Sequence, residues 1–251
     1  MASKVAVVGA NGRMGSLIAR IVEQEPGLEL VASMNSSSSL EEMLAADLVV
    51  DVTRPDVSAD VVEFAVQHGR KVLVGTSGWS AERIQGLSGA LAAAPEAGVI
   101  IIPNFSLGSV LATRLSMVAS RFYDSIEILE AHHAGKVDSP SGTAVRTAEL
   151  MAKARSRSRG PVEAPHIDQL ARGQQVAGIP VHSLRLHGVV ARQEVIFGGT
   201  GELLSVVHDT ISPAAYEQGI RLALAALPDA VGVTVGLEHL LDLGALTADE
   251  A

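Results

Sequence analysis

Residues 131–144 read AHHAGKVDSPSGTA and combine two histidines, a lysine, an aspartate and a Ser-Gly-Thr turn. Lys136 supplies a point positive charge that can pair with a carboxylate. The turn formed by Ser141, Gly142 and Thr143 comes just before a predicted helix, so its backbone N–H groups and hydroxyls can bind a carboxylate at the helix N-terminus. The loop therefore predicts a binding site for a small dianionic substrate.

His132 and His133 stand at the end of a predicted strand, where neighbouring side chains point to opposite faces. We expect one histidine to face the reacting centre as a general acid and the other to bind or support. The same divergence disfavours a metal site built on the pair, and we predict no metal. The alternative is a set of surface histidines, a solvated Lys136 and ordinary turn chemistry, with Asp138 shaping the loop or pairing with a nearby cation.

A second group of residues could hold phosphate. Gly9, Gly12 and Gly15 lie between a predicted strand and a predicted helix, with the spacing G-x-x-G-x-x-G. Glycines permit a tight turn whose backbone N–H groups approach a pyrophosphate, and the helix N-terminus favours the negative charge. A tight turn without a ligand is the alternative, but the strand–turn–helix context favours dinucleotide binding.

Two further loops follow predicted strands: GTSG at residues 75–78 and PNFS at residues 103–106. Each alone could be an ordinary turn. Because ligands of parallel sheets bind at the carboxyl ends of the strands, both loops are expected to line a nicotinamide pocket beside the glycine turn.

The position after the second predicted strand usually carries an acid that binds the ribose 2′-hydroxyl, and here it is Asn35, followed by serines at 36–39. An uncharged side chain does not repel a 2′-phosphate, and Arg13 could add positive charge. We predict use of both NADH and NADPH with a modest preference for NADPH. A polar loop indifferent to the phosphate is the alternative.

Short apolar runs alternate with helical patterns in the first part of the chain, which predicts an α/β fold with a Rossmann-like, doubly wound parallel sheet. The expected strands are residues 4–8, 28–32, 48–52, 71–74 and 99–102. The first helix should carry Met14, Leu17, Ile18, Ile21 and Val22 on one apolar face, and Ser58 could cap the second.

The pattern changes after residue 106. A helix over 107–122, a strand over 125–130, a helix from Thr143 and strands over 181–186, 189–197 and 202–208 predict a second α+β domain with an open, mainly antiparallel sheet joined by hairpins. Residues 160–178 are expected to be a mobile connection, and the basic end of the preceding helix, 153–160, to be solvated. The predicted domains are 1–106 for dinucleotide binding, 107–212 for substrate binding and oligomerisation, and 213–251 returning to the first.

Composition limits the function. The chain has 251 residues, of which 47% are hydrophobic, and a net charge of −9, which argues against nucleic acid as a partner. No apolar run approaches the ~20 residues of a membrane span, and no signal peptide is evident. The absence of cysteine excludes disulfides and thiolate chemistry. A cytoplasmic protein with no membrane partner is expected.

The motifs VGANGRMG, DVTRPD, VGTSG, PNFSLG, EAHHAGKVDSPSGTA and GIPVHSLRLHGVVARQEVIFG occur in order along nearly the whole chain. Through these motifs and their order, the chain resembles the dihydrodipicolinate reductase family of bacterial lysine and diaminopimelate synthesis. The histidine–lysine loop is the specific part of the resemblance. The family would imply NADPH or NADH as cofactor, reduction of the cyclic imine dicarboxylate 4-hydroxy-tetrahydrodipicolinate to tetrahydrodipicolinate, and a homotetramer joined through the second-domain sheets.

The resemblance also implies residue roles. His132 becomes the proton donor and Lys136 the second catalytic residue, while His133 and the turn at 141–143 hold the substrate carboxylates. The implied cofactor-binding residues are Gly9, Ala10, Asn11, Gly12, Arg13, Met14, Gly75, Thr76, Ser77, Ile102, Pro103, Asn104 and Phe105.

The chain departs from the family pattern at Gly135, where a polar residue is usual, and at Ser77, where a threonine is usual. Two other functions remain open: another NAD(P)H-dependent reductase of imino or amino acids, and a non-catalytic dinucleotide-sensing protein. A hydrolase is disfavoured because SPSG is not a G-x-S-x-G nucleophile elbow.

Overall fold

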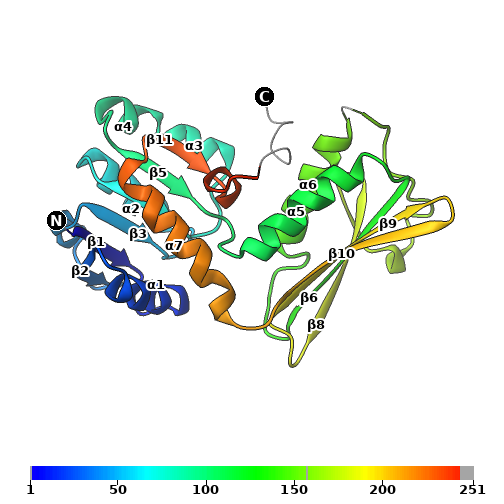
Figure 1. Cartoon of the computed structure of the whole chain (residues 1–251), viewed down its shortest axis with the longest axis horizontal. Helices are drawn as coiled ribbons and strands as arrows, with labels where there is room; N and C mark the ends of the chain where they lie inside the picture. Colours follow the sequence, from blue (N-terminus) through cyan, green and yellow to red (C-terminus); the bar gives the residue numbers. More distant parts are fainter. Residues whose placement is uncertain (1, 157, 244–251) are drawn as a thin grey trace. The chain divides into compact units, whose positions relative to one another are not determined.

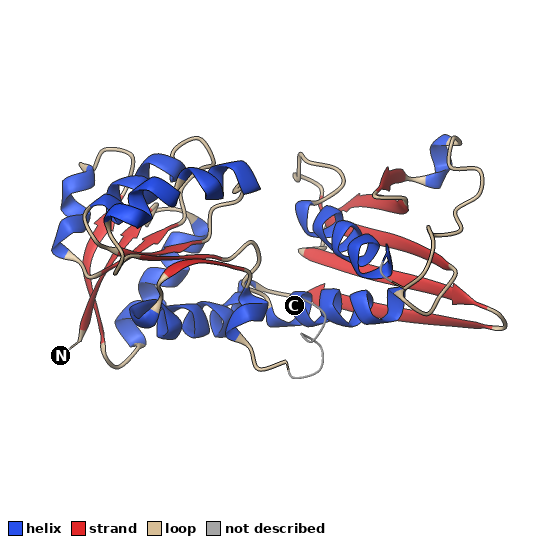
Figure 2. Cartoon of the chain, turned by 90° about the horizontal axis from the view of Figure 1, so that it is seen from above, coloured by secondary structure: helices blue, strands red, loops and turns tan. Residues whose placement is uncertain are grey.

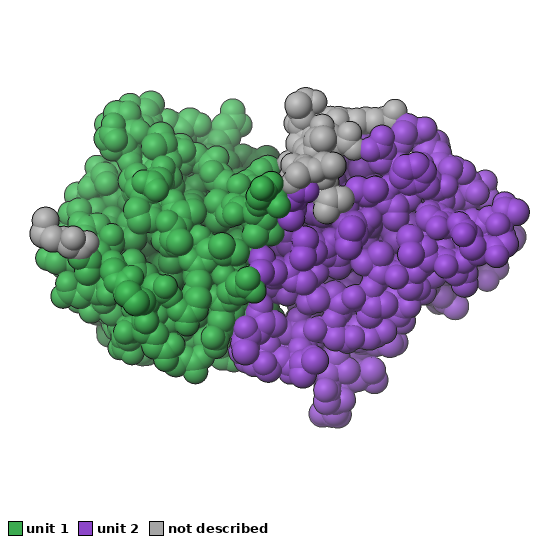
Figure 3. Space-filling view, in the orientation of Figure 1, with its two compact units in different colours: residues 1–105, 216–242 green, residues 106–215, 243–251 purple. Residues whose placement is uncertain are grey.

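The computed structural model describes residues 2–156 and 158–243, which form two compact units (Figure 3). The first unit comprises the chain up to residue 105 together with 216–242, and the second comprises 106–215. The predicted return of 213–251 is met by strand β11, which joins the first unit's sheet, whereas residues 244–251 lie outside the described residues.

The first unit is built on a six-stranded parallel sheet in the order β11-β5-β4-β3-β1-β2 (Figure 1). Because all pairs are parallel, the carboxyl ends of the strands share one edge. The chain runs from β1 to β2 on one side and to β3 on the other, so the order reverses between β1 and β3. The strands are β1 (Ser3–Val8), β2 (Leu28–Met34), β3 (Leu48–Asp51), β4 (Lys71–Val74), β5 (Gly98–Ile101) and β11 (Gly232–Val235).

Helices lie on both faces of this sheet (Figure 2), and the residues of β3 are buried throughout, as the continuous apolar runs predict. Helix α1 buries Leu17, Ile18, Ile21 and Val22 of its predicted apolar face, whereas Met14 is only half-buried. The helices and 3-10 turns of the unit are α1 (Arg13–Gln24), η1 (Leu40–Ala45), α2 (Ser58–Gln67), α3 (Ala81–Gly86), α4 (Ser88–Ala93), α7 (Glu217–Ala226), η4 (Leu227–Asp229) and η5 (Leu237–Leu240).

The second unit has a mixed five-stranded sheet in the order β10-β9-β6-β8-β7. Helices α5 and α6 belong to the same unit, and Ala144, Ala148 and Met151 of α6 form a core with Ile128 and Phe197 of the sheet. The elements are α5 (Leu107–Ser120), β6 (Ser125–His133), α6 (Gly142–Ser156), η2 (Leu170–Arg172), β7 (Gln174–Val176), β8 (Ile179–Leu186), β9 (Ala191–Gly199), β10 (Glu202–Thr210) and η3 (Pro213–Tyr216). The predicted fold class of both halves is confirmed.

Three local predictions about the second unit are wrong. Strands β8 and β9 do not form a hairpin, because β6 lies between them, parallel to β8 and antiparallel to β9. The expected mobile connection contains η2 and β7, which pairs with β8. Arg155, expected to be solvated, is 3% exposed, and its guanidinium donates to the carbonyl oxygens of Ser120 and Gly160.

Ser58 does not cap the second helix. Val57 is the N-cap, and Ser58 is the first helical residue, with a buried hydroxyl that donates to the carboxylate of Asp51. Strand β3 ends at Asp51, whose buried carboxylate would be costly to leave without hydrogen-bond donors. The Ser58 hydroxyl supplies one of these donors and therefore does not cap the helix.

Candidate active site

The carboxyl ends of four strands place the predicted dinucleotide residues along one edge of the first sheet. Strand β1 ends at Val8, β4 at Val74 and β5 at Ile101. The glycine turn, the GTSG loop and the PNFS loop therefore begin at the same edge of the sheet, with β3 between the first two. This edge includes the point between β1 and β3 where the strand order reverses, which is where open α/β sheets bind ligands.

The glycine turn is too tight for side chains. Gly9 has a φ of +90°, and a Cβ added at Gly15 would lie 2.1 Å from the carbonyl oxygen of Gly9. In the described chain, no side chain caps the N-terminus of α1 at Gly12, and its first turn carries no acid. The exposed backbone N–H groups and positive end of the helix dipole fit a bound pyrophosphate.

Two of the predicted loops meet at Val52, the residue after β3, and the third approaches Gly75. A Cβ at Gly9 would lie 2.6 Å from the carbonyl oxygen of Val52, and one at Gly75 would lie 2.9 Å from Val52 Cγ1 and 2.8 Å from Phe105 Cε2. The structure thus brings Gly9, Gly75 and Phe105 together. Sequence reasoning missed Val52, although its position directly after a buried strand was a usable signal.

A buried carboxylate fixes the neighbouring loop. Asp51 is fully buried, and it accepts hydrogen bonds from Thr53 Oγ1 at 2.6 Å, from Thr53 N at 3.2 Å and from the Ser58 hydroxyl. Trp79, which follows the GTSG loop, donates from Nε1 to Ser58 Oγ at 2.9 Å. The loops after β3 and β4 are therefore joined through one hydrogen-bonded network.

Asn35 lies beside the glycine turn. Strand β2 ends at Met34, whose carbonyl oxygen accepts from Gly9 N at 2.9 Å and Ala10 N at 3.0 Å. The Oδ1 atom of Asn35 accepts from the backbone N and the hydroxyl of Ser37 at 2.9 and 2.7 Å. Asn35 thus orders the serine loop and leaves no carboxylate at this position of the edge.

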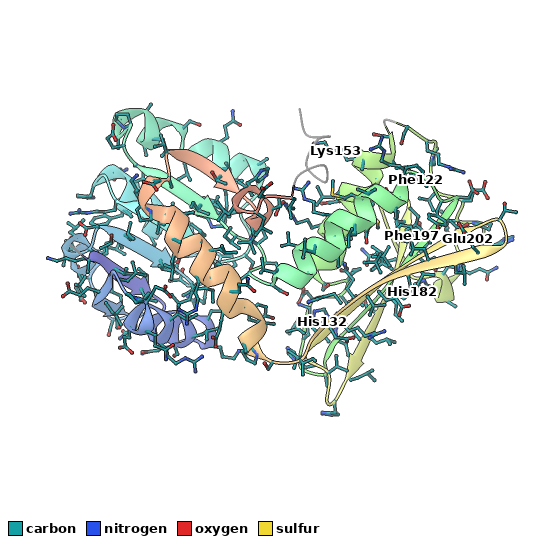
Figure 4. All side chains as sticks on the ribbon, viewed as in Figure 1. Phe122, His132, Lys153, His182, Phe197 and Glu202 are labelled. Atoms are coloured by element: carbon teal, nitrogen blue, oxygen red, sulfur yellow. The ribbon has the colours of Figure 1, made fainter. Side chains whose placement is uncertain are left out.

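In the second unit, His132 is the last residue but one of strand β6 and contacts a buried carboxylate. His132 Nδ1 lies 2.6 Å from Oε2 of Glu130, a side chain with no exposed surface. Figure 4 labels His132 on the ribbon of this unit. The two residues are separated by one position, so both lie on the face of β6 that carries Ile126 and Ile128, which pack against α6.

Arg185 of β8 completes the pair. Its Nη1 and Nη2 atoms donate to the two oxygens of Glu130 at 3.0 and 2.9 Å. Burial alone would raise the pKa of Glu130, but hydrogen bonds from Arg185, Ser183 and His132 bring it below its usual range. Glu130 is therefore ionised at neutral pH.

The pKa of His132 is lowered. Burial is the largest cause; Glu130 opposes it by stabilising the imidazolium, and the positive charges of Lys136 and Arg185 add to the lowering. His132 is thus a stronger acid than an exposed histidine, and its proton is more easily given to a bound molecule.

Lys136 lies in the loop after β6 and is paired with Asp138. Its Nζ atom is 2.7 and 2.8 Å from the two carboxylate oxygens, and the pairing lowers the pKa of Asp138. The expectation that Asp138 pairs with a nearby cation is confirmed. His133 is exposed, unlike half-buried His132, and its carbonyl oxygen accepts from Lys136 N at 3.0 Å.

The Ser-Gly-Thr turn begins α6 as predicted. Ser141 is buried; its Oγ accepts from Ala144 N at 3.2 Å, and its own N–H donates to Glu130 Oε1 at 3.2 Å. Gly142 is exposed and Thr143 half-buried. The structure therefore brings His132, Lys136 and the turn together around Glu130.

Glu130 and Arg185 were missed by sequence reasoning. Glu130 had a signal, because it stands two residues before His132 on a strand and must share its face. Arg185 had none until the pairing was known: β6 and β8 are parallel, with His132 opposite Arg185.

Two family models together match almost the whole chain. The model for the N-terminus of dihydrodipicolinate reductase matches residues 3–105, and the model for its C-terminus matches residues 108–241. The chain belongs to the dihydrodipicolinate reductase family. The resemblance noted from the motifs is thereby confirmed, and with it membership of a family of NAD(P)H-dependent reductases.

Relatives with this activity in their names are similar over most of their length. A 4-hydroxy-tetrahydrodipicolinate reductase of Clavibacter michiganensis is 63% identical over 243 residues, covering 97% of this chain and 87% of the relative. One from Streptomyces coelicolor is 42% identical, covering 96% and 98%. The dipicolinate-bound dihydrodipicolinate reductase of a Paenisporosarcina species has a TM-score of 0.81 at 28% identity, covering 96% of this chain and 100% of that one.

More distant structures share the fold alone. GenD2 of gentamicin A biosynthesis, solved with NAD, has a TM-score of 0.59 at 15% identity, covering 91% of this chain and 87% of that one.

Within residues 2–156 and 158–243, no helix has the length and apolar character to cross a membrane. The same residues contain no group of three or more His, Asp or Glu side chains suited to a metal ion.

Proposed function

We propose that this protein reduces 4-hydroxy-tetrahydrodipicolinate to tetrahydrodipicolinate with NADPH or NADH, in lysine and diaminopimelate synthesis. One substrate molecule, one reduced nicotinamide and one proton give the product, the oxidised nicotinamide and water. The observation that carries this proposal is His132, held by Glu130 beside Lys136, in a chain that belongs to the dihydrodipicolinate reductase family.

The reduced nicotinamide supplies the hydride when bound. In our proposal the glycine turn at Gly9–Met14 holds the pyrophosphate, where a narrow turn meets the uncapped N-terminus of α1. The residues Gly75–Ser77 and Ile102–Phe105 line the nicotinamide, because Gly75 lies against both Phe105 and Val52 at the same strand edge. Asn35 and its serine loop receive the adenosine ribose.

His132 donates the proton and Lys136 binds a substrate carboxylate in this proposal. Lys136 must then exchange Asp138 for the substrate. Asp138 keeps 59% of its side-chain surface exposed, and exposed ion pairs contribute only about 0–1 kcal/mol, so this exchange costs little. The exposed His133, the Ser141 hydroxyl and the groups of Gly142 and Thr143 are the proposed partners of the other substrate oxygens.

A homotetramer is also proposed, joined through the second-unit sheet. The sheet face opposite α6 carries exposed apolar residues at alternate positions of β8 and β10: Leu184 (42% exposed), Leu186 (47%), Leu203 (76%) and Val207 (43%). Apolar side chains on an open sheet face favour association with another copy of the chain. Sedimentation of the wild type and of Leu203→Glu tests this, since a monomeric wild type would contradict it.

The remaining proposals concern location and partners. A cytoplasmic enzyme that acts on a small dicarboxylate, without nucleic acid or membrane partners, agrees with the net charge of −9 and with a reaction that consumes reduced nicotinamide.

The deciding experiment is oxidation of NADPH or NADH, followed by absorbance, with freshly generated 4-hydroxy-tetrahydrodipicolinate. We expect turnover with this imine, competitive inhibition by dipicolinate, and little turnover with related oxo-acids. Turnover with oxo-acids alone would indicate a different imino or amino acid reductase. Cofactor binding without turnover of any of them would indicate a dinucleotide sensor.

Cofactor choice is tested at Asn35. We propose a modest preference for NADPH, because the uncharged Asn35 does not repel a 2′-phosphate as a carboxylate at this position would. Asn35→Asp should shift the ratio of kcat/KM toward NADH. A wild type strongly selective for NADH, or an unchanged ratio in the variant, would contradict this role.

A further inference from the structure

The Glu130 carboxylate receives hydrogen bonds on both oxygens. Oε1 accepts from Arg185 Nη2 at 2.9 Å and from Ser141 N at 3.2 Å. Oε2 accepts from Arg185 Nη1 at 3.0 Å and lies 2.6 Å from His132 Nδ1. An ionised carboxylate can only accept, and every Arg185 and Ser141 contact here is a donor. The group is therefore held as an anion inside the fold.

This anion determines the tautomer of His132. Because Glu130 Oε2 accepts, His132 Nδ1 must carry a hydrogen in both the neutral and the charged imidazole. The Nε2 atom is then the one that gains and loses the catalytic proton. A histidine without such a partner could present either nitrogen.

The charges around His132 oppose one another. Glu130, on the same strand, favours the imidazolium, whereas Arg185 from β8 and Lys136 from the following loop disfavour it. Asp138 pairs with Lys136 and weakens that cation's effect. Arg185 also compensates the charge of Glu130, so the histidine does not face an isolated buried anion.

The same pair holds the substrate loop at two points. Arg185 Nη2 donates to the carbonyl oxygen of Asp138 at 2.6 Å, and Glu130 Oε1 accepts from Ser141 N. Asp138 in turn pairs with Lys136. The loop that carries the proposed substrate-binding groups is therefore built around the Glu130–Arg185 pair.

We infer that Glu130, neutralised by Arg185, is a positioning residue that fixes the tautomer and orientation of His132 and stabilises its imidazolium form. This inference rests on the proposed reductase function for its kinetic consequence. Its effect on His132 itself is independent of any substrate.

The main test is Glu130→Gln, which keeps the shape of the side chain and removes its charge. The imidazolium loses its anionic partner while Arg185 remains, so the pKa of His132 should fall by about 1 unit or more. Nuclear magnetic resonance of ¹⁵N-labelled histidine reports both this pKa and the tautomer. We also expect kcat to fall about 10²-fold, with a smaller change in KM.

Glu127→Gln is the matched control, because Glu127 lies three residues earlier on β6 and pairs with His182 and Arg172 instead. It should leave the pKa and tautomer of His132 as in the wild type. An unchanged His132 pKa in Glu130→Gln, or an equal change in Glu127→Gln, would overturn the inference.

Wild-type spectra keep the inference testable if Glu130→Gln does not fold. They should show neutral His132 protonated at Nδ1, and predominance of the Nε2–H form would overturn the inference. A wild type with the expected tautomer but no imine reduction would refute the proposed function alone. Normal turnover with the wrong tautomer would refute the inference alone.

Discussion

Strand β6 carries two Glu–His–Arg clusters on opposite faces. The inner cluster is Glu130 with His132 and Arg185, and the outer cluster is Glu127 with His182 and Arg172. His132 and His182 are both labelled in Figure 4. In each cluster one carboxylate binds a histidine through one oxygen and an arginine through the other or both. Residue type alone therefore does not separate them.

Burial separates the two clusters. The Glu130 side chain is 0% exposed, whereas that of Glu127 is 32% exposed. Removing water strengthens each electrostatic contact and also makes an unpaired charge costly. The pKa values of Glu130 and His132 are both lowered in the inner cluster. Within a single chain the outer cluster has the form of a partly exposed ion pair, on the sheet face that we propose joins subunits, and the inner one has that of a proton-donor site.

Neighbouring groups separate them further. The inner cluster adjoins Lys136 and the Ser141 turn, both of which could bind an anion. Its carboxylate also takes the Ser141 N–H in addition to the arginine. The comparison indicates that two features distinguish the inner cluster: α6 covers its face of β6, and the following loop supplies Lys136 and the Ser141 turn.

The largest expected effect on kcat comes from replacing His132, and the equivalent change at His182 is its control. His132→Ala should lower kcat by about 10²- to 10⁴-fold, because it removes the proposed proton donor, while cofactor affinity stays near that of the wild type. His182→Ala should change kcat only slightly. Steady-state kinetics and cofactor titration measure both quantities. Near-wild-type turnover in His132→Ala would remove this residue from the mechanism.

Replacing the arginine should reduce the free energy of unfolding more in the inner cluster than in the outer one. Arg185→Met removes the cation that balances the buried Glu130 carboxylate and should reduce the free energy of unfolding by about 3–5 kcal/mol. Arg172→Met breaks a partly exposed pair and should cost about 0–1 kcal/mol. Urea denaturation of the two variants gives the comparison. Equal losses of unfolding free energy would mean that the burial of Glu130 does not make its ion pair more stabilising than the partly exposed pair of Glu127.

The difference between these clusters was only partly readable in the sequence. The spacing of Glu130 and His132 places both on one face of a strand, but which face is covered depends on α6. Arg185 meets Glu130 only because β6 inserts between β8 and β9. The glycine at 188 indicates a reversal of the chain and says nothing of the partner strand. Pairing between distant strands is set by tertiary packing, which local pattern does not encode.

Elements with strong local signals were predictable. The continuous apolar runs of β1 and β3 and the inner face of α1 follow from periodicity alone. Arg155 was not predictable, because a charged residue near a helix end is usually solvated and here it donates to carbonyl oxygens of Ser120, Tyr123 and Gly160. The roles of His132, His133, Lys136 and the turn stay predictions until variants are measured.

The pH dependence of catalysis should follow the inner histidine. His132 must be protonated to donate, so kcat/KM should fall as the pH rises through its pKa, which burial lowers below the ordinary 6.5. A bound dianion favours the imidazolium, so the corresponding limb of kcat should lie at higher pH. His182→Ala should keep both limbs. A kcat/KM limb well above 6.5 would contradict the lowered pKa.

The smallest expected effect is the pH dependence of stability. The pKa of Glu130 is lower in the folded chain than its ordinary 4.5, because hydrogen bonds from Arg185, Ser183 and His132 outweigh burial. Ionised Glu130 therefore contributes stability that is fully present above its unfolded pKa and is lost as the pH falls through its folded pKa.

Urea denaturation between pH 6 and about pH 3 can isolate this contribution. The wild type should lose more stability on acidification than Glu130→Gln does, because the variant has no carboxylate to protonate at this position. Glu127→Gln should follow the wild type closely, since the outer pair contributes only about 0–1 kcal/mol at any pH. Parallel curves for the wild type and Glu130→Gln would show that Glu130 is not stabilised as an anion, and the distinction between the two faces of β6 would then rest on the neighbouring loop alone.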